Sequence, residues 1–144
     1  MNALSLSRTA AARPANTEAA KVKVKTVAYW ATTGVLVFCL TGGLFQLLGV
    51  KTTVEGITRL GYPAYIIPAL GLAKVLAIFA VLWPGLPRLK EWAYAGIVFN
   101  MLGATFSHVA QGDEMWIIVA TTAIAALALT SWSLRPQSRR LRHR

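Results

Sequence analysis

Residues 64–83 read AYIIPALGLAKVLAIFAVLW, a stretch of 20 residues in which Lys74 is the only charged side chain. An α-helix needs about 20 predominantly apolar residues to cross the hydrocarbon core of a bilayer. The apolar residues follow one another around the whole helix and leave no polar face, which a helix at the surface of a soluble protein would need. The stretch therefore predicts a transmembrane helix with one lysine near its middle.

Three further segments have the same character, at 27–49, 91–110 and 115–134. Hydrophobic residues make up 56% of the 144-residue chain and charged residues 14%, against about a quarter in soluble domains, which argues against a soluble globular protein. A β-barrel is the only other fold that spans a bilayer, but its strands alternate apolar and polar residues, whereas these segments are nearly continuous apolar runs. We therefore predict an all-α fold, a membrane-spanning bundle of four helices.

The positions of the basic residues predict the orientation of this bundle. The formal net charge is +10, and 12 of the 15 Lys and Arg residues lie in the N-terminal arm, in the connection between the second and third segments, and in the C-terminal tail. Cytoplasmic loops carry such an excess, so we expect both termini in the cytoplasm. The predicted organisation is a disordered basic arm at 1–25, without the apolar run of a cleaved signal peptide, a membrane domain at 26–134, and a basic tail at 135–144.

The two basic ends also predict what the protein meets at the membrane surface. Lysine and arginine close to the cytoplasmic face attract anionic lipids. Neither end carries aromatic interleaving or a nucleic-acid-binding motif, so we expect no nucleic-acid partner.

The connection between the first two segments has a pattern of its own. Val54, Ile57 and Leu60 lie three residues apart, whereas Glu55 and Arg59 lie one helical turn apart on another face. This pattern predicts a short amphipathic helix on the outer surface of the membrane.

Lys74 is the most informative polar residue of the predicted spans. A lysine at the centre of a span costs roughly 2.5–3.5 kcal/mol on insertion scales and normally finds a partner inside the bundle. Gly71, one turn before it, is small enough to let another helix come close. Lys74 and Asn100 stand thirteen residues before and after Pro87 in the predicted turn, so Asn100 is the expected partner. Two interpretations remain open: a site for an anionic ligand or a proton, and a polar contact that holds helices together.

Other polar residues extend this candidate site. Asn100, Ser107 and His108 share the small and polar face of the third segment, and Gln46 in the first segment is expected at a level similar to that of His108. Asp113, in the loop after the third segment, is placed to hydrogen-bond His108, and a capping role for that histidine stays open. With one cysteine and two histidines, the chain has no metal-ligand spacing, no cofactor motif and no catalytic constellation.

Several short motifs, in order and spacing, resemble the DoxX-like family. The residues that carry the resemblance are Tyr29-Trp30, Thr33-Gly34 and Thr41–Gly49 in the first segment, Leu60–Pro63, Leu70-Gly71 and Lys74 in and before the second, and Pro87–Gly96, Gly103-Ala104, Ser107-His108 and Gly112-Asp113 in and after the third. In members with a lysine at the position of Lys74, the position of Asn100 is often aspartate and that of Gln46 often basic. This chain departs from that pattern at both positions, so a family mechanism that needs an intramembrane Lys–Asp pair is not expected to transfer to it.

The resemblance implies a small four-helix protein of the bacterial inner membrane, and some members are linked to membrane redox complexes. We therefore expect an accessory or anchor subunit of a quinone-dependent redox system, with a quinone reached through a partner subunit. The alternative is a transporter or binder of a small molecule or a proton that uses an inward polar track around Lys74. A homo-oligomer is a further possibility for so small a chain.

Overall fold

The computed structural model describes the backbone of residues 3–141 and the side chains of residues 17–141, and within these it is helical without strands. Its α-helices are α1 (Ala3–Leu40), α2 (Gly42–Leu47), α3 (Lys51–Arg59), α4 (Ile67–Leu82), α5 (Pro87–Gln111) and α6 (Met115–Leu134). Two 3₁₀ turns, η1 (Ala64–Ile66) and η2 (Gln137–Arg139), precede α4 and follow α6. The all-α prediction is confirmed for this part of the chain.

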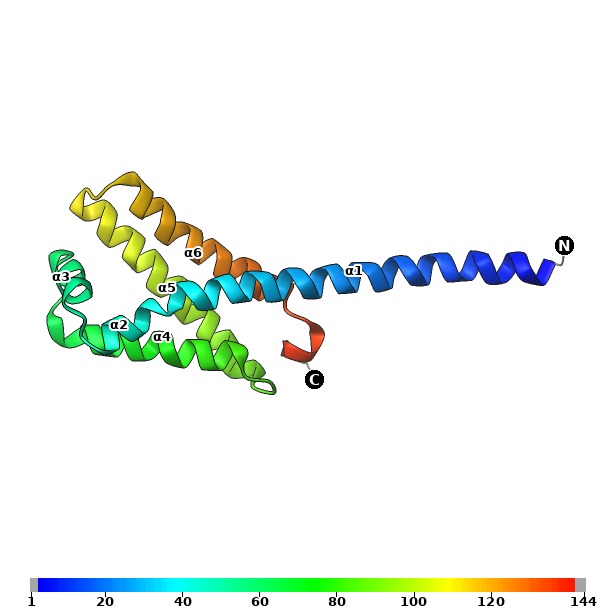
Figure 1. Cartoon of the computed structure of the whole chain (residues 1–144), viewed down its shortest axis with the longest axis horizontal. Helices are drawn as coiled ribbons and strands as arrows, with labels where there is room; N and C mark the ends of the chain where they lie inside the picture. Colours follow the sequence, from blue (N-terminus) through cyan, green and yellow to red (C-terminus); the bar gives the residue numbers. More distant parts are fainter. Residues whose placement is uncertain (1–2, 142–144) are drawn as a thin grey trace.

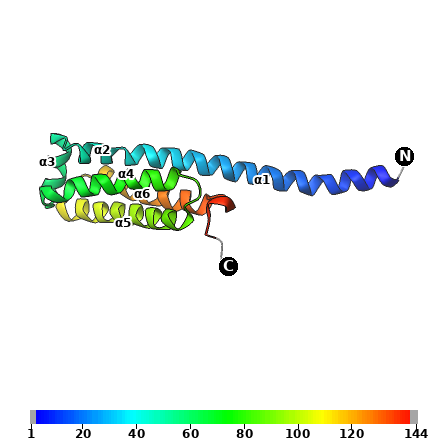
Figure 2. The ribbon, with the colours of Figure 1, turned by 90° about the horizontal axis from the view of Figure 1, so that it is seen from below.

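The helices form one bundle with a long extension. Contacts join α1 to α6, α6 to α5, α5 to α4 and α4 to α2, so the α1–α2 column, α4, α5 and α6 pack side by side (Figure 1). The N-terminal part of α1 extends well beyond the other helices at the end of the bundle where the α4–α5 connection and the C-terminal segment lie (Figure 2).

Three of these columns are long and apolar enough to cross a membrane, over Thr17–Leu47, Ala64–Leu82 and Met115–Leu134. The first of them contains both α1 and α2. Helix α5 has the length, with 25 residues, but is less apolar because its first two turns include Arg88, Lys90 and Glu91. The chain is thus a helical membrane protein, and a fourth crossing by α5 stays a prediction.

The N-terminal arm differs from the prediction of a disordered segment over 1–25. Helix α1 begins at Ala3 and continues without a break into the first apolar segment. Alanine and lysine, which are frequent between residues 10 and 25, have high helix propensity. A helix already nucleated in the bundle is extended at little cost, because only nucleation is strongly unfavourable.

The first predicted span, 27–49, is divided between two helices. Helix α1 ends at Leu40, Thr41 forms a turn, and α2 resumes at Gly42. The N–H of Thr41 is shared between the carbonyls of Val37 and Phe38 at 3.1 Å each, as is common where a helix tightens. This break redirects the chain so that α2 packs against α4.

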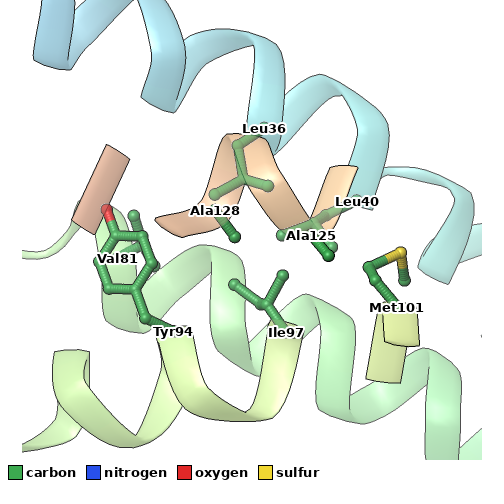
Figure 3. Close-up of a cluster of buried hydrophobic side chains, with 8 residues drawn as sticks. All are labelled: Leu36, Leu40, Val81, Tyr94, Ile97, Met101, Ala125 and Ala128. Carbon is green, nitrogen blue, oxygen red and sulfur yellow. The ribbon is translucent and has the colours of Figure 1, made fainter. Parts of the chain in front are cut away.

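The buried core is small and lies where four helices meet. Figure 3 shows its side chains converging from α1 (Leu36, Leu40), α4 (Val81), α5 (Tyr94, Ile97, Met101) and α6 (Ala125, Ala128). By contrast, large side chains such as Phe38, Phe79 and Phe99 are more than half exposed. This arrangement suits a lipid environment, in which outward apolar side chains meet acyl chains instead of water.

Candidate functional site

A close crossing of α2 and α4 positions the first pair of predicted site residues. Added Cβ atoms show how close it is: at Gly71 one would lie 2.6 Å from the backbone oxygen of Gly43, and at Gly43 one would lie 2.6 Å from the Cβ of Lys74. Only glycine permits such an approach. The prediction that Gly71 admits a neighbouring helix is therefore confirmed, and that helix is α2.

Gln46 on α2 is the partner that this crossing brings to Lys74. The Lys74 Nζ donates a hydrogen bond to the Gln46 Oε1 at 3.1 Å, and the Gln46 side chain is buried. The predicted bond from Lys74 to Asn100 is wrong. The two residues do occupy neighbouring helices, but the close glycine crossing of α2 and α4 brings Gln46 to the ammonium instead.

Asn100 instead shares a cavity with Lys74. This cavity of about 330 Å³ lies between α4 and α5 and reaches Leu40 of α1. Its walls are apolar apart from the lysine and the amide, and consist of Leu40, Leu70, Ala73, Leu76, Ala77, Ala80, Leu89, Trp92, Ala93, Gly96 and Ile97. Lys74 and Asn100 are thus the polar groups of an otherwise apolar space between these helices, which exposed side chains such as Leu76 and Trp92 border on the outer side.

These two side chains keep unused hydrogen-bonding capacity. An ammonium has three donors and an amide has two donors and an acceptor. Within the described residues, Lys74 makes the single bond to Gln46, and the side chain of Asn100 makes none. The arrangement suits an amphiphilic molecule that places a hydrogen-bond acceptor between Lys74 and Asn100 and its apolar part against the walls.

Ser107 and His108, the remaining predicted site residues, have partners elsewhere. His108 Nδ1 donates to Asp113 Oδ2 at 2.7 Å, as predicted, and Asp113 also pairs with Arg59 of α3. The Ser107 Oγ lies 2.8 Å from the Tyr62 hydroxyl oxygen in the segment between α3 and η1. Among the residues that the structure describes, no hydrogen bond or ion pair joins this group to Lys74, so the predicted track consists of two separate groups.

Asp113 carries the charge that organises this second group. The hydrogen bond from His108 holds the pKa of the Asp113 carboxyl below its usual value, and the Arg59 charge acts in the same direction. The carboxylate is therefore ionised at neutral pH and links α3 to the loop between α5 and α6. The hydrogen bond of His108 to Asp113 therefore gives this histidine a structural role.

Sequence reasoning did not find a third polar group, at the opposite end of the bundle. The Lys90 side chain is fully buried, and its Nζ donates to the carbonyl oxygens of Ala80 at 2.7 Å, Val81 at 3.1 Å and Trp83. Arg139 adds bonds from Nη1 to the carbonyls of Val81 at 3.0 Å and Leu82 at 3.2 Å. These cations satisfy the C-terminal carbonyls of α4, which have no partner within that helix.

Lys90 belongs to the basic connection from which the sequence predicts membrane topology, but the sequence also contains a signal for its structural role. Lys90 follows the α4 C-terminus by eight residues across a turn containing Pro84, Gly85 and Pro87. Such a short turn returns the chain to the helix end that it has just left. Burial and the charges of Arg139 and Arg135 lower the pKa of Lys90 to about 8, whereas its three carbonyl contacts favour the ammonium form.

Within the part of the chain that the structure describes, no three or more His, Cys, Asp or Glu residues are grouped to hold a metal ion. A family model described as the DoxX-like family matches residues 30–131, a range that includes all five predicted site residues. No curated protein and no solved structure matches the chain.

Proposed function

Since this chain belongs to the DoxX-like family, we propose that it is an accessory or anchor subunit of a quinone-linked redox system in the bacterial cytoplasmic membrane. Its membrane character is supported by the family match and by helices long and apolar enough to cross a bilayer. The partner subunit supplies the redox chemistry, and this chain supplies a binding site inside the membrane.

The proposed arrangement has four crossings, with α5 as the third. Both termini lie in the cytoplasm, which agrees with the excess of Lys and Arg in the arm, the α4–α5 connection and the tail. Helix α3 then lies on the outer surface, with Val54, Ile57 and Leu60 toward the lipid. The Asp113 group ties α3 to the outer end of the bundle, and the Lys90 group closes its cytoplasmic end.

The cavity between α4 and α5 is the single observation that carries the binding role. It combines apolar walls with two polar groups whose hydrogen-bonding capacity is not used up within the described residues. A quinone fits this composition, because it joins an apolar ring and tail to carbonyl oxygens. Lys74 and Asn100 would donate to a carbonyl oxygen, while the walls exclude water from it. A quinone held there would supply an acceptor for the electrons of the partner subunit.

The first test is native mass spectrometry of the tagged full chain, extracted gently from its own membranes. We expect a stoichiometric redox subunit together with a retained quinone. If the protein instead travels alone, or as a homo-oligomer holding a different small molecule, the accessory role is wrong. The second candidate then applies, a binder or transporter of a small molecule or a proton, which is favoured by the unused protons of the Lys74 ammonium inside a membrane helix.

A pair of variants tests the cavity itself. Lys74→Leu removes a polar group that lines the cavity, so we expect normal expression and loss of the retained quinone. Gln46→Leu is the matched control, because it removes the partner of Lys74 without lining the cavity, and it should keep the quinone. If Lys74→Leu still retained the quinone and both variants had altered thermal stability, the Lys74–Gln46 pair would serve only to hold the two helices together.

A further inference from the structure

The cytoplasmic end of the α5–α6 pair holds a second hollow, separate from the cavity at Lys74. Its volume is about 650 Å³, and its lining includes Arg135, Arg140, Ser133 and Trp132 near the end of α6, with Glu91 from α5. Two guanidinium groups thus face one space where α5 begins and α6 ends.

An apolar groove continues from this hollow. It has a volume of about 350 Å³ and runs between α5 and α6, lined by Val98, Phe99 and Leu129 among others. Glu91 and Trp132 line both spaces, so the hollow and the groove meet. A space bordered by two arginines that opens into an apolar groove between two helices has the shape of a site for an amphiphile.

Arg135 provides a polar atom that lacks a partner. The residue is 4% exposed, and its Nη1 is buried with no hydrogen-bond partner in the described chain. Its other nitrogens are used, because Nη2 donates to Glu91 Oε1 at 2.7 Å and Nε donates to the Trp132 carbonyl at 3.0 Å. The guanidinium also lies over the Tyr94 and Trp132 rings, 5.3 Å and 5.4 Å from their centroids, so what Nη1 lacks is a hydrogen-bond acceptor. A buried guanidinium nitrogen without an acceptor is costly, so an acceptor from outside the chain is expected.

The charge of the hollow favours an anion. The Glu91 carboxylate is fully engaged, since Oε1 accepts from Arg135 and Oε2 accepts from the Trp132 Nε1 at 2.6 Å. Arg140 uses Nε and Nη2 for the carbonyls of Arg135 and Ser133, both at 2.7 Å, and its Nη1 has no partner among the described residues. Glu91 neutralises Arg135, so the charge of Arg140 remains unbalanced in the hollow.

From this juxtaposition we propose that the cytoplasmic end of the α5–α6 pair binds an anionic phospholipid. The phosphate accepts hydrogen bonds from Arg135 Nη1 and Arg140 Nη1, and one acyl chain lies in the groove along Phe99 and Leu129. Basic pockets between transmembrane helices at the cytoplasmic face bind anionic headgroups in this way. The site does not involve Lys74 and is independent of the quinone that we propose there.

The test is a competition read by native mass spectrometry of the full chain in detergent. The probes are phosphatidylglycerol and phosphatidylcholine with identical acyl chains, at equal concentration. We expect the wild type to retain phosphatidylglycerol preferentially, and Arg140→Gln to lower that preference on the order of fivefold. Arg88→Gln is the matched control, because Arg88 is an exposed cation at the same end of α5 that lines neither space, and it should keep the preference.

A second variant tests the groove without changing charge. Leu129→Trp fills the groove and should reduce retention of both lipids while leaving the guanidinium groups in place. Three results would overturn the proposal: equal losses in Arg140→Gln and Arg88→Gln, which indicate general charge attraction; unchanged retention in Leu129→Trp; or full displacement of the lipid by inorganic phosphate, which indicates a site for the free ion.

Discussion

Gly71 shows how one residue determines the position of the candidate site. The Cβ of any other residue here would meet the Gly43 oxygen and the Leu47 nitrogen, each at 2.6 Å. Both are backbone atoms, which cannot rotate away as a side chain can. The distance between α2 and α4, and with it the bond between Gln46 and Lys74, therefore depends on the absence of a side chain at this position.

We predict that Gly71→Ala destabilises the protein by about 1–3 kcal/mol, the usual cost of overpacking, because α2 must move away from α4. Thermal unfolding in detergent measures this loss. Gly103→Ala is the control, since a Cβ at Gly103 meets nothing within 4 Å, and its stability should be unchanged or slightly raised. Equal stability of the two variants would show that the crossing is looser than described.

At the scale of elements, side chains from other helices satisfy the ends of helices. The last carbonyls of α4 accept hydrogen bonds from Lys90 and Arg139. The N–H groups at this end of α4 already have partners within the helix. A buried carbonyl that lacks a donor has lost its bonds to water without replacement, which is costly. A lysine that the sequence assigns to topology therefore also determines how α4, α5 and the C-terminal segment meet.

Lys90→Met is predicted to lower the free energy of unfolding by about 1–3 kcal/mol, because buried carbonyls of α4 lose their donor. Denaturation followed by circular dichroism in detergent measures the change. Arg88→Met, two residues away and exposed, removes the same charge without breaking a contact, and its effect should be much smaller. If both variants were equally stable, the contacts of Lys90 would contribute nothing beyond its charge.

The tie between α3 and the α5–α6 loop should depend on pH. The folded pKa of Asp113 is lowered by His108 and Arg59, so the unfolded chain binds the proton more readily. The resulting stabilisation is present above the unfolded pKa of about 3.9 and is lost as the pH falls through the lower folded pKa. The melting temperature of the wild type should therefore exceed that of Asp113→Asn at pH 5, and the difference should shrink toward pH 3. A constant difference would contradict an ionised Asp113 as its source.

For the whole molecule, the number of membrane crossings can be tested by labelling single cysteines introduced at two positions. Replacing Cys39 with serine leaves a chain without cysteine, to which Glu55→Cys in α3 or Ser138→Cys in η2 is added. Three crossings separate these positions in the proposed arrangement. A membrane-impermeant maleimide should label Glu55→Cys in intact spheroplasts and Ser138→Cys only after permeabilisation. Labelling of both from one side would mean that α5 does not cross, and the reverse pattern would invert the orientation.

The helical class, the membrane character and the family follow from the sequence alone. Apolar runs such as 64–83 and 115–134 are local properties, because the cost of placing a residue in lipid depends on that residue and its depth. The C-terminal ends of α4 and α6 were predicted to within one residue for the same reason. The motifs around Gly71 and Lys74 were sufficient for the DoxX-like family, and the match over residues 30–131 confirms it.

Apart from the local His108–Asp113 pair, only the tertiary structure decided which polar groups meet. Equal distance from Pro87 places Lys74 and Asn100 at one depth, but it does not specify which helix packs against Lys74. The close glycine contact between α2 and α4 leads to the bond with Gln46 instead. The sequence likewise did not predict three further features: the extension of α1 to Ala3, the capping of α4 by Lys90, and the Nη1 of Arg135 that lacks a hydrogen-bond partner. The apolar pattern is a sum over single residues, whereas a hydrogen bond or a cavity depends on the relative positions of several helices.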